Sequence, residues 1–372
     1  MKKKLLPFFV VIILLGCSNQ KQDEVPELFL PTSLPAPAIT TGEHDRKIYI
    51  AAYDDTSEKF GVLTQKCIYS IEKCNGIEFL PIILKQNVIS SMFWAPDGSK
   101  FATIIEENSS QEIAIIDSNG QNSKNITNTP GEIETLLGWA SDSTKIIYQK
   151  DINQNSNFPS EIWIVDSDGG NSHKLLDGCC AQKSPEGRFY YLAPQNNDGL
   201  DMDIYMAETI SGGAFKVVNL TNSPGTERKF SISSDGQKIA FASSQGYLFQ
   251  LFLMNIDGTK KIPFEVYSAN IDDITWSPDD SKIVFTSTPS HTSSSDVYVL
   301  DLKNEDLINL TNSSPYPSRS PIWSPDSSKI LFVSDKDFGL SNIYVVNVDG
   351  SNLVRLTNAN ANLGFLSVTW QP

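Results

Sequence analysis

The strongest constraint on the fold of this chain is a short motif that recurs along most of its length. Its clearest copy lies at residues 323–327, where Trp-Ser-Pro-Asp-Ser precedes an apolar segment. The positions equivalent to Trp323 are separated by 45, 44, 49, 44, 47 and 47 residues, and they are Trp94, Trp139, Lys183, Ile232, Trp276, Trp323 and Trp370. This spacing is typical of four-stranded propeller blades and is well above that of leucine-rich repeats.

One complete repeat predicts four short antiparallel strands. Residues 322–323 end a first strand, Pro-Asp-Ser makes a tight turn, and residues 329–334 form a second strand. Residues 342–347 form a third strand, and Asp349-Gly350 is a hairpin turn before a fourth strand at 352–357. The second and third strands are apolar without alternation, so both faces of the sheet should be covered by neighbouring repeats.

The two ends of the repeat region are incomplete in complementary ways. Near its start we expect a second strand at 47–53, a third at 67–73 and, after an Asn75-Gly76 turn, a fourth at 77–84. At its end, residues 366–370 form a first strand alone. The sequence therefore predicts an all-β, seven-bladed β-propeller of four-stranded antiparallel blades, whose ring is closed by the C-terminal strand. A six-bladed propeller is the alternative.

The N-terminal region predicts export and lipidation. Residues 1–16 combine three lysines with an apolar run too short to cross a bilayer, which is typical of a signal peptide. Leu14-Leu15-Gly16-Cys17 resembles the lipobox of bacterial lipoproteins, so we expect Cys17 to be acylated and the protein to be anchored to the cell envelope, in the periplasm or on the outer face of a bacterial membrane. Residues 17–46 are Pro-rich and predict a flexible tether, and residues 47–372 form the propeller domain.

The repeat resembles the propeller repeats of the TolB family. The Trp-Ser-Pro-Asp turn, the Ile-Tyr-Val-Val-Asn-Val-Asp-Gly hairpin and the Leu-Thr-Asn ending carry this likeness, which covers residues 47–372. The resemblance implies a non-catalytic scaffold that binds a protein or a peptide. The chain departs from TolB in having a lipobox, a tether and seven repeats, where TolB has a separate N-terminal domain and six blades.

Charge restricts the possible partners. Loss of the first 16 residues removes three lysines and no acids, which leaves 26 basic against 44 acidic residues. Nucleic acid is therefore an improbable partner, and attachment to a membrane should depend on the acyl chains of Cys17. We expect a monomeric propeller that needs no cofactor.

The sequence offers no recognisable catalytic constellation. The three histidines, His44, His173 and His291, lie far apart in the chain, and no nucleophile elbow or phosphate-binding loop is present. Asp166-Ser-Asp168-Gly169 resembles part of a calcium loop but lacks its remaining ligands, so a hairpin is favoured. An enzyme or a carbohydrate-binding module that uses the central channel is the alternative function.

Four cysteines remain after Cys17, and their oxidation state is open. Cys67 and Cys74 are expected at opposite ends of one strand, about 23 Å apart, which would prevent a disulfide. Cys179 and Cys180 form either a vicinal disulfide or two buried thiols, with the thiols favoured.

The binding site is predicted on one face of the propeller. The first-to-second and third-to-fourth strand turns are tight and lie on one face, whereas the long segments emerge on the other. The long segments are rich in acids, so we expect a basic partner there, although ordinary solvated loops would have the same composition. The candidate partner-binding residues are Asp151, Asp198, Asp201, Asp203, Asp296, Asp335 and Asp337.

The lipobox generates a direct test. Cys17→Ser removes the acyl acceptor and should move the protein from the membrane fraction to the soluble exported fraction, measured by immunoblotting after fractionation. Equal membrane association of the two forms would contradict lipid anchoring.

Overall fold

The computed structural model describes residues 46–54, 59–67, 74–80, 87–88, 92–107, 110–118, 122–140, 142–151, 160–195, 201–210, 214–244, 247–268, 270–289, 294–312, 315–337, 340–357 and 363–370. Over these ranges the secondary structure is entirely β-strand. They contain no helix that is long and apolar enough to cross a membrane.

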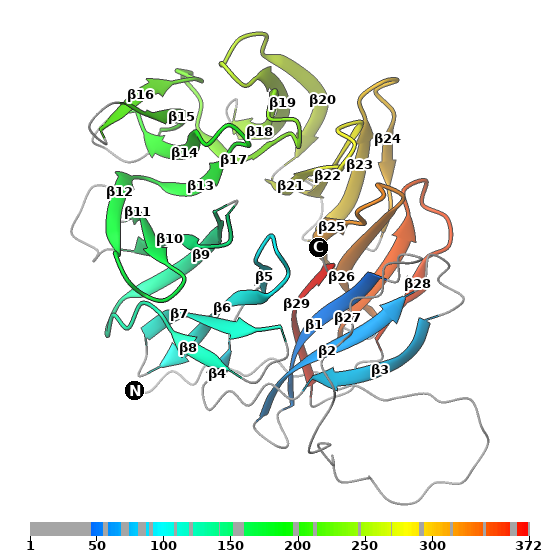
Figure 1. Ribbon diagram of the computed structural model, residues 1–372. Helices are drawn as coiled ribbons and strands as arrows, with labels where there is room; N and C mark the ends of the chain where they lie inside the picture. Colours follow the sequence, from blue (N-terminus) through cyan, green and yellow to red (C-terminus); the bar gives the residue numbers. More distant parts are fainter. Residues whose placement is uncertain are drawn as a thin grey trace, which may run out of the picture.

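The strands fall into repeats of four, arranged around a central opening with the first strands innermost and the fourth strands outermost (Figure 1). The first strands are β5 (Phe93–Trp94), preceded by β4 (Asn87–Val88), β9 (Ile133–Trp139), β13 (Cys179–Lys183), β17 (Glu227–Ile232), β21 (Asn270–Trp276), β25 (Ser318–Trp323) and β29 (Leu363–Trp370). The second strands are β1 (Arg46–Asp54), β6 (Lys100–Glu107), β10 (Lys145–Asp151), β14 (Phe189–Pro194), β18 (Lys238–Ser244), β22 (Lys282–Thr288) and β26 (Lys329–Asp337).

The outer half of each repeat is built in the same way. The third strands are β2 (Lys59–Cys67), β7 (Ser110–Asp117), β11 (Ser160–Asp166), β15 (Met202–Thr209), β19 (Phe249–Asn255), β23 (Asp296–Asp301) and β27 (Leu340–Asn347). The fourth strands are β3 (Cys74–Leu80), β8 (Ser123–Asn125), β12 (His173–Asp177), β16 (Phe215–Asn219), β20 (Ile262–Ser268), β24 (Leu307–Asn309) and β28 (Val354–Arg355).

Hydrogen bonding groups these strands into antiparallel sheets. Five sheets have four strands each, and the sheet that contains β29 has the order β29-β1-β2-β3. A sixth sheet has nine strands because two adjacent repeats are joined by one parallel pair, Gln111 with Ile133. The prediction of four-stranded antiparallel sheets is confirmed, and the C-terminal strand β29 pairs with β1 from Ile48–Trp370 to Asp54–Leu363.

The first repeat differs from the prediction in its strand positions. The third strand, β2, ends at Cys67 instead of beginning there, and Asn75-Gly76 lies inside β3. Gly76 is the extra residue between the pairs Gln65–Ile77 and Lys66–Asn75, so it makes a β-bulge and no turn. Cys67 and Cys74 are direct partners across β2 and β3. The expectation that they lie far apart is therefore wrong, since paired residues of antiparallel strands have Cα atoms about 4.5–5.5 Å apart.

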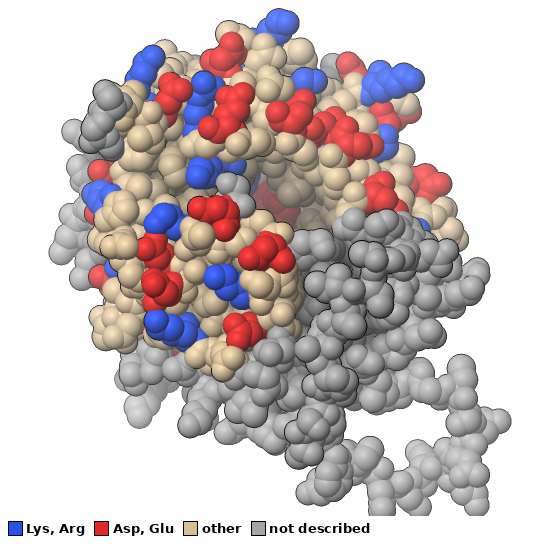
Figure 2. Space-filling model, viewed as in Figure 1, with Lys and Arg blue, Asp and Glu red and all other residues tan. Residues whose placement is uncertain are grey.

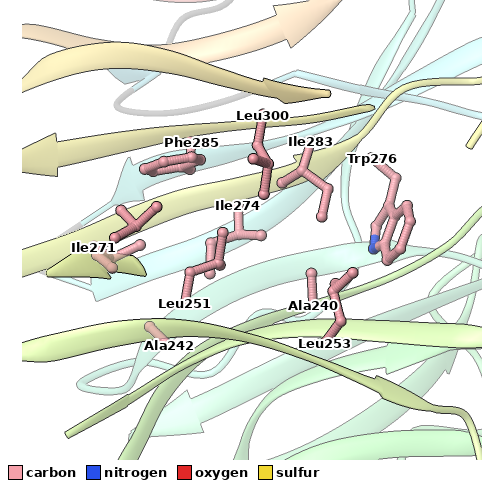
Figure 3. Packing of buried hydrophobic residues seen from close by; sticks show 11 residues of the cluster. Ala240, Ala242, Leu251, Leu253, Ile271, Ile274, Trp276, Ile283, Phe285 and Leu300 are labelled. Atoms are coloured by element: carbon pink, nitrogen blue, oxygen red, sulfur yellow. The ribbon is translucent and has the colours of Figure 1, made fainter. Parts of the chain in front are cut away.

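The hydrophobic core lies between neighbouring sheets. Figure 3 shows one such layer, in which side chains from β18 and β19 face those of β21, β22 and β23. Ile271, Ile283 and Phe285 are fully buried there. Equivalent clusters fill the adjacent sheet-to-sheet spaces. Each repeat therefore buries its apolar faces only against the repeats beside it.

Three of the motif tryptophans link their repeat to the one before it. The indole Nε1 of Trp276 donates to the Ser231 carbonyl at 3.0 Å, and that of Trp323 donates to the Thr275 carbonyl at 3.2 Å. Trp139 does the same with Phe93 at 2.7 Å. Where Lys183 replaces the tryptophan, the neighbouring Gln182 bridges the next repeat through Phe230 and Ile232.

The tight turns add a second connection between repeats. The carboxylates of Asp97, Asp142, Asp235, Asp279 and Asp326 accept the backbone N–H two residues later, which is ordinary turn chemistry. The last turn residue then reaches the previous repeat: Ser143 Oγ accepts the Asp97 N–H and Ser327 Oγ accepts that of Asp279. Asp280 accepts the N–H groups of Ser234 and Asp235.

Removal of one indole donor tests this linkage. Trp276→Phe leaves the Ser231 carbonyl without its partner in a buried site, so the free energy of unfolding should fall by about 1–3 kcal/mol in a denaturant titration. The control Tyr247→Phe alters a fully exposed ring and should change it by less than about 0.5 kcal/mol. Equal stability of Trp276→Phe and the unmodified protein would show that the bond is not needed.

Candidate partner-binding face

The long-loop face is defined by the last residues of the second strands, the first residues of the third strands and the first residues of the first strands. Antiparallel order brings all of these chain ends to the same side of the molecule, opposite the tight turns. Figure 2 shows a face of the molecule that is hollowed at its centre, with acidic and basic side chains interspersed around the hollow.

Two of the predicted acids are buried inside the sheets. Asp203 in β15 is 1% exposed and Asp296 in β23 is 8% exposed. The Asp203 carboxylate accepts from Thr221 Oγ1 at 2.8 Å and Asn219 Nδ2 at 2.6 Å. Asp296 is held in the same way by Thr311 and Asn309. These carboxylates secure the Leu-Thr-Asn turn to the third strand, so they are not exposed loop acids as the sequence suggested.

Two more candidates, Asp335 and Asp337, lie among the last three residues of β26 and have specific partners. Asp335 lies within β26 and pairs with Arg319 at 3.0 Å. Asp337 accepts from Arg355 at 2.8 Å and from the Tyr344 hydroxyl. Burial opposes its charge, but these two bonds outweigh burial, and the pKa of Asp337 is lowered.

The other three candidates are placed less uniformly. Asp151 ends β10, is exposed, and accepts from Ser160 Oγ at 2.8 Å. Asp201 precedes β15 and is half-buried. Asp198 lies outside the described residues.

Basic residues also line this face, and the sequence reasoning missed them. Arg228 and Lys229 are exposed in β17, one of the innermost strands, and Lys229 lies 3.9 Å from Asp272 of β21. Arg319 lies in the equivalent region of β25. Arg228 and Lys229 precede the motif position Ile232 by four and three residues, and Arg319 precedes Trp323 by four. This spacing was the available signal, because it places the three residues near the start of a first strand. The face therefore carries both signs of charge.

Two pairs of carboxyl groups are buried at junctions between repeats. Glu134 of β9 is 0% exposed and shares Thr129 with Glu112 of β7. Glu227 of β17 is 1% exposed, accepts from Ser223 and Ser243 at 2.9 Å each, and lies beside Asp203. In the described part of the molecule, Oε2 of each glutamate has no hydrogen-bond partner.

Burial changes the protonation of both glutamates. Desolvation raises the pKa of Glu134 to about 7, although Thr127, Thr129 and Lys150 favour the charged form. Desolvation and the neighbouring Asp203 raise the pKa of Glu227 to about 7, against hydrogen bonds from two serines. A proton on Glu227 removes its repulsion with Asp203 and turns one of its carboxyl oxygens into a hydrogen-bond donor.

The structure also places the calcium-loop-like segment and one of the three histidines that the sequence singled out. Asp166 and Gly169 form the expected hairpin, in which the Gly169 N–H donates to the Asp166 carbonyl at 2.8 Å. His173 is exposed at the start of β12, whereas His44 and His291 lie outside the described residues. Over the described ranges, no group of three or more His, Cys, Asp or Glu residues could hold a metal ion.

Radial four-stranded antiparallel sheets with inter-sheet cores define the protein as a β-propeller. Residues 82–278 and 273–368 match the model of the TolB beta propeller domain. The chain belongs to this family.

Curated relatives agree with the family match. The Tol-Pal system protein TolB of Francisella tularensis subsp. tularensis (strain WY96-3418) is 27% identical over 282 residues, which cover 62% of this chain and 64% of that protein. TolB of subsp. mediasiatica (strain FSC147) gives the same identity and coverage. The chain thus spans about 64% of the length of these relatives.

Solved structures support the fold alone. TolB from Acinetobacter baumannii is 17% identical with a TM-score of 0.50, covering 84% of this chain and 79% of that one. A puromycin hydrolase is 10% identical with a TM-score of 0.64, covering 85% and 52%. The propeller domain of the Trilobed protease from Pyrococcus furiosus is 14% identical with a TM-score of 0.58, covering 86% and 94%.

The buried glutamates predict a pH-dependent stability. Because the pKa of Glu227 is higher in the folded protein than in the unfolded chain, its stabilising contribution is present below about pH 4.5 and is lost as the pH rises to about 7. Glu227→Gln keeps the shape without this titration. The free energy of unfolding of the variant, relative to the unmodified protein, should therefore rise by about 2 kcal/mol between pH 5 and pH 8.

The measurement is denaturant unfolding at both pH values. Glu305→Gln, which alters an exposed acid, is the control and should show no such rise. If the difference in free energy of unfolding between Glu227→Gln and the unmodified protein does not vary with pH, the pKa of Glu227 is not raised in the folded protein.

Proposed function

We propose that this protein is an exported, lipid-anchored β-propeller that binds a protein or a peptide without catalysing a reaction. The match of residues 82–368 to the TolB beta propeller domain carries the proposal, since the curated relatives are named as proteins of the Tol-Pal system. Acylation of Cys17 would hold the propeller near an envelope membrane, and residues 18–46 would serve as its tether.

The scaffold in this proposal is a closed ring of seven blades. Seven groups of four strands are distinguishable, because the nine-stranded sheet consists of two such groups joined by one residue pair and preceded by β4. The pairing of β29 with β1 supports closure by the C-terminal strand. Such pairing would cover strand edges that otherwise invite association with other chains.

The partner would dock on the long-loop face and present basic side chains. Glu106 and Asp151, at the ends of β6 and β10, are exposed acids that remain available there. Arg228 and Lys229 add positive charge nearer the central opening. A surface with both signs favours a partner with complementary charges in a fixed orientation. An enzyme or carbohydrate-binding module working in the channel is the alternative.

Charge reversal on the long-loop face tests the proposal. Lipidated protein solubilised in detergent is used as bait, and partners that bind the unmodified chain are identified by mass spectrometry. Glu106→Lys combined with Asp151→Lys should slow association with such a partner, and the effect should weaken as salt screens the charges. Asp203 is left unchanged because reversing a buried carboxylate would disturb the fold.

The matched control reverses two acids of the opposite face, Glu305→Lys and Asp349→Lys. If the control weakens binding as much as the long-loop pair, or if association is indifferent to salt, the long-loop face is not the docking surface. A search of the central channel would then be the better course.

A further inference from the structure

Two cysteines lie side by side on an innermost strand. Cys179 and Cys180 are the first two residues of β13, and both are half-buried free cysteines. Their Sγ atoms are 3.2 Å apart. Successive side chains of a regular strand point to opposite faces, so this proximity needs a local change in the backbone.

A β-bulge supplies that change. The pairing of β13 with β14 shifts between Cys179 and Gln182, and Cys180 has a φ of +59°. A residue in this left-handed region turns its side chain out of the alternating pattern. The Cys180 N–H donates to Gln149 Oε1 at 3.2 Å, which ties the bulge to β10 of the preceding repeat.

The residue before the pair is also constrained. Gly178 has a φ of +154°, and a Cβ atom there would lie 2.6 Å from the Tyr191 ring and 2.8 Å from the Leu192 carbonyl oxygen. Glycine is therefore required for β13 to approach β14 this closely. The backbone conformations of Gly178 and Cys180, on either side of Cys179, are both constrained. The fold itself therefore brings the two sulfur atoms together.

The surroundings make the two thiols chemically unequal. A hydrogen bond from Cys179 stabilises the Cys180 thiolate, and Lys229 adds positive charge, so the pKa of Cys180 is lowered although burial and Asp151 oppose this. The pKa of Cys179 is raised by its interaction with Cys180 and by burial. Cys180 is therefore the better nucleophile at neutral pH.

We propose that Cys179 and Cys180 form a redox-active vicinal dithiol that is converted to a vicinal disulfide by exchange with an external disulfide. The donor class is an exported thiol–disulfide oxidoreductase or a low-molecular-weight disulfide. The physiological donor rests on the export proposed above, whereas the reactivity of the pair does not.

The exchange has two balanced steps. The Cys180 thiolate attacks one sulfur of the donor disulfide, which forms a mixed disulfide and expels a thiolate. That thiolate takes the proton of Cys179, whose sulfur then attacks Cys180 Sγ and releases the second donor thiolate. The second thiolate takes from solvent the proton that Cys180 gave up when its own thiolate formed. The dithiol loses two electrons and two protons, and the donor disulfide gains them.

Peptide mapping of the purified full chain tests the proposal. The protein is treated with either oxidised glutathione or dithiothreitol, quenched in acid, alkylated with iodoacetamide and digested with trypsin. The peptide 175–183 holds both cysteines of the pair, whereas Cys67 and Cys74 fall in two separate peptides. After glutathione treatment it should be two hydrogens lighter than the reduced form and unalkylated. After dithiothreitol it should carry two carbamidomethyl groups.

Single variants resolve the order of attack. Cys179→Ser should accumulate a stable glutathione adduct on Cys180, and it should do so several-fold faster than Cys180→Ser accumulates one on Cys179. Two alkylated thiols after oxidation, a lasting glutathione adduct on the unmodified chain, or equal rates in the two variants would each overturn the proposal. Far-ultraviolet circular dichroism verifies that both variants are folded.

Discussion

The hydrogen bond from the indole of one repeat to a backbone carbonyl of the preceding repeat is the interaction on which the rest of the structure depends. Partners in these bonds are 45 to 48 residues apart, which is one repeat. The same interval separates the turn residues that bond across repeats. Each sheet is apolar on both faces and would be unstable alone, so these contacts fix the distance at which neighbouring sheets can share a core.

The sequence predicted what is determined locally or by repetition. Strands β25 to β28 appear where the alternation of apolar segments and Pro-Asp or Asp-Gly turns placed them. Asp349 and Gly350 form their turn, with Gly350 at a φ of +83°. Such turns depend on nearby residues alone, and a motif repeated seven times makes each assignment more certain than a single copy would.

The failures arose where distant residues decide the outcome. Asn75-Gly76 is a strong turn signal, but these residues pair with β2, and Gly76 forms a β-bulge in β3 instead of a turn. Asp203 and Asp296 were grouped with loop acids because their partners lie 15 to 18 residues further along the chain. A signal was nevertheless present: in four repeats the threonine of the Leu-Thr-Asn or Ile-Thr-Asn ending bonds a polar residue among the first three of the third strand, as in Thr127–Glu112, Thr221–Asp203, Thr311–Asp296 and Thr357–Asn342.

Acids that bond neighbouring strands are poor candidates for partner binding, which reduces the number of residues to test. Most of the candidate acids complete junctions between strands, so the proposed recognition would depend on the few exposed acids and on the basic residues of the first strands. The vicinal cysteines are a separate candidate site, because the bulge in β13 places their side chains next to one another. Both residues are only partly buried.

The most direct test of the account is hydrogen exchange on a chain that lacks residues 366–372. If neighbouring repeats hold one another and β29 closes the ring, amides of residues 48–51 should lose protection and the thermal midpoint should fall, because this part of β1 loses its partner strand. Unchanged protection in β1 and an unchanged midpoint would contradict closure of the ring by the C-terminal strand.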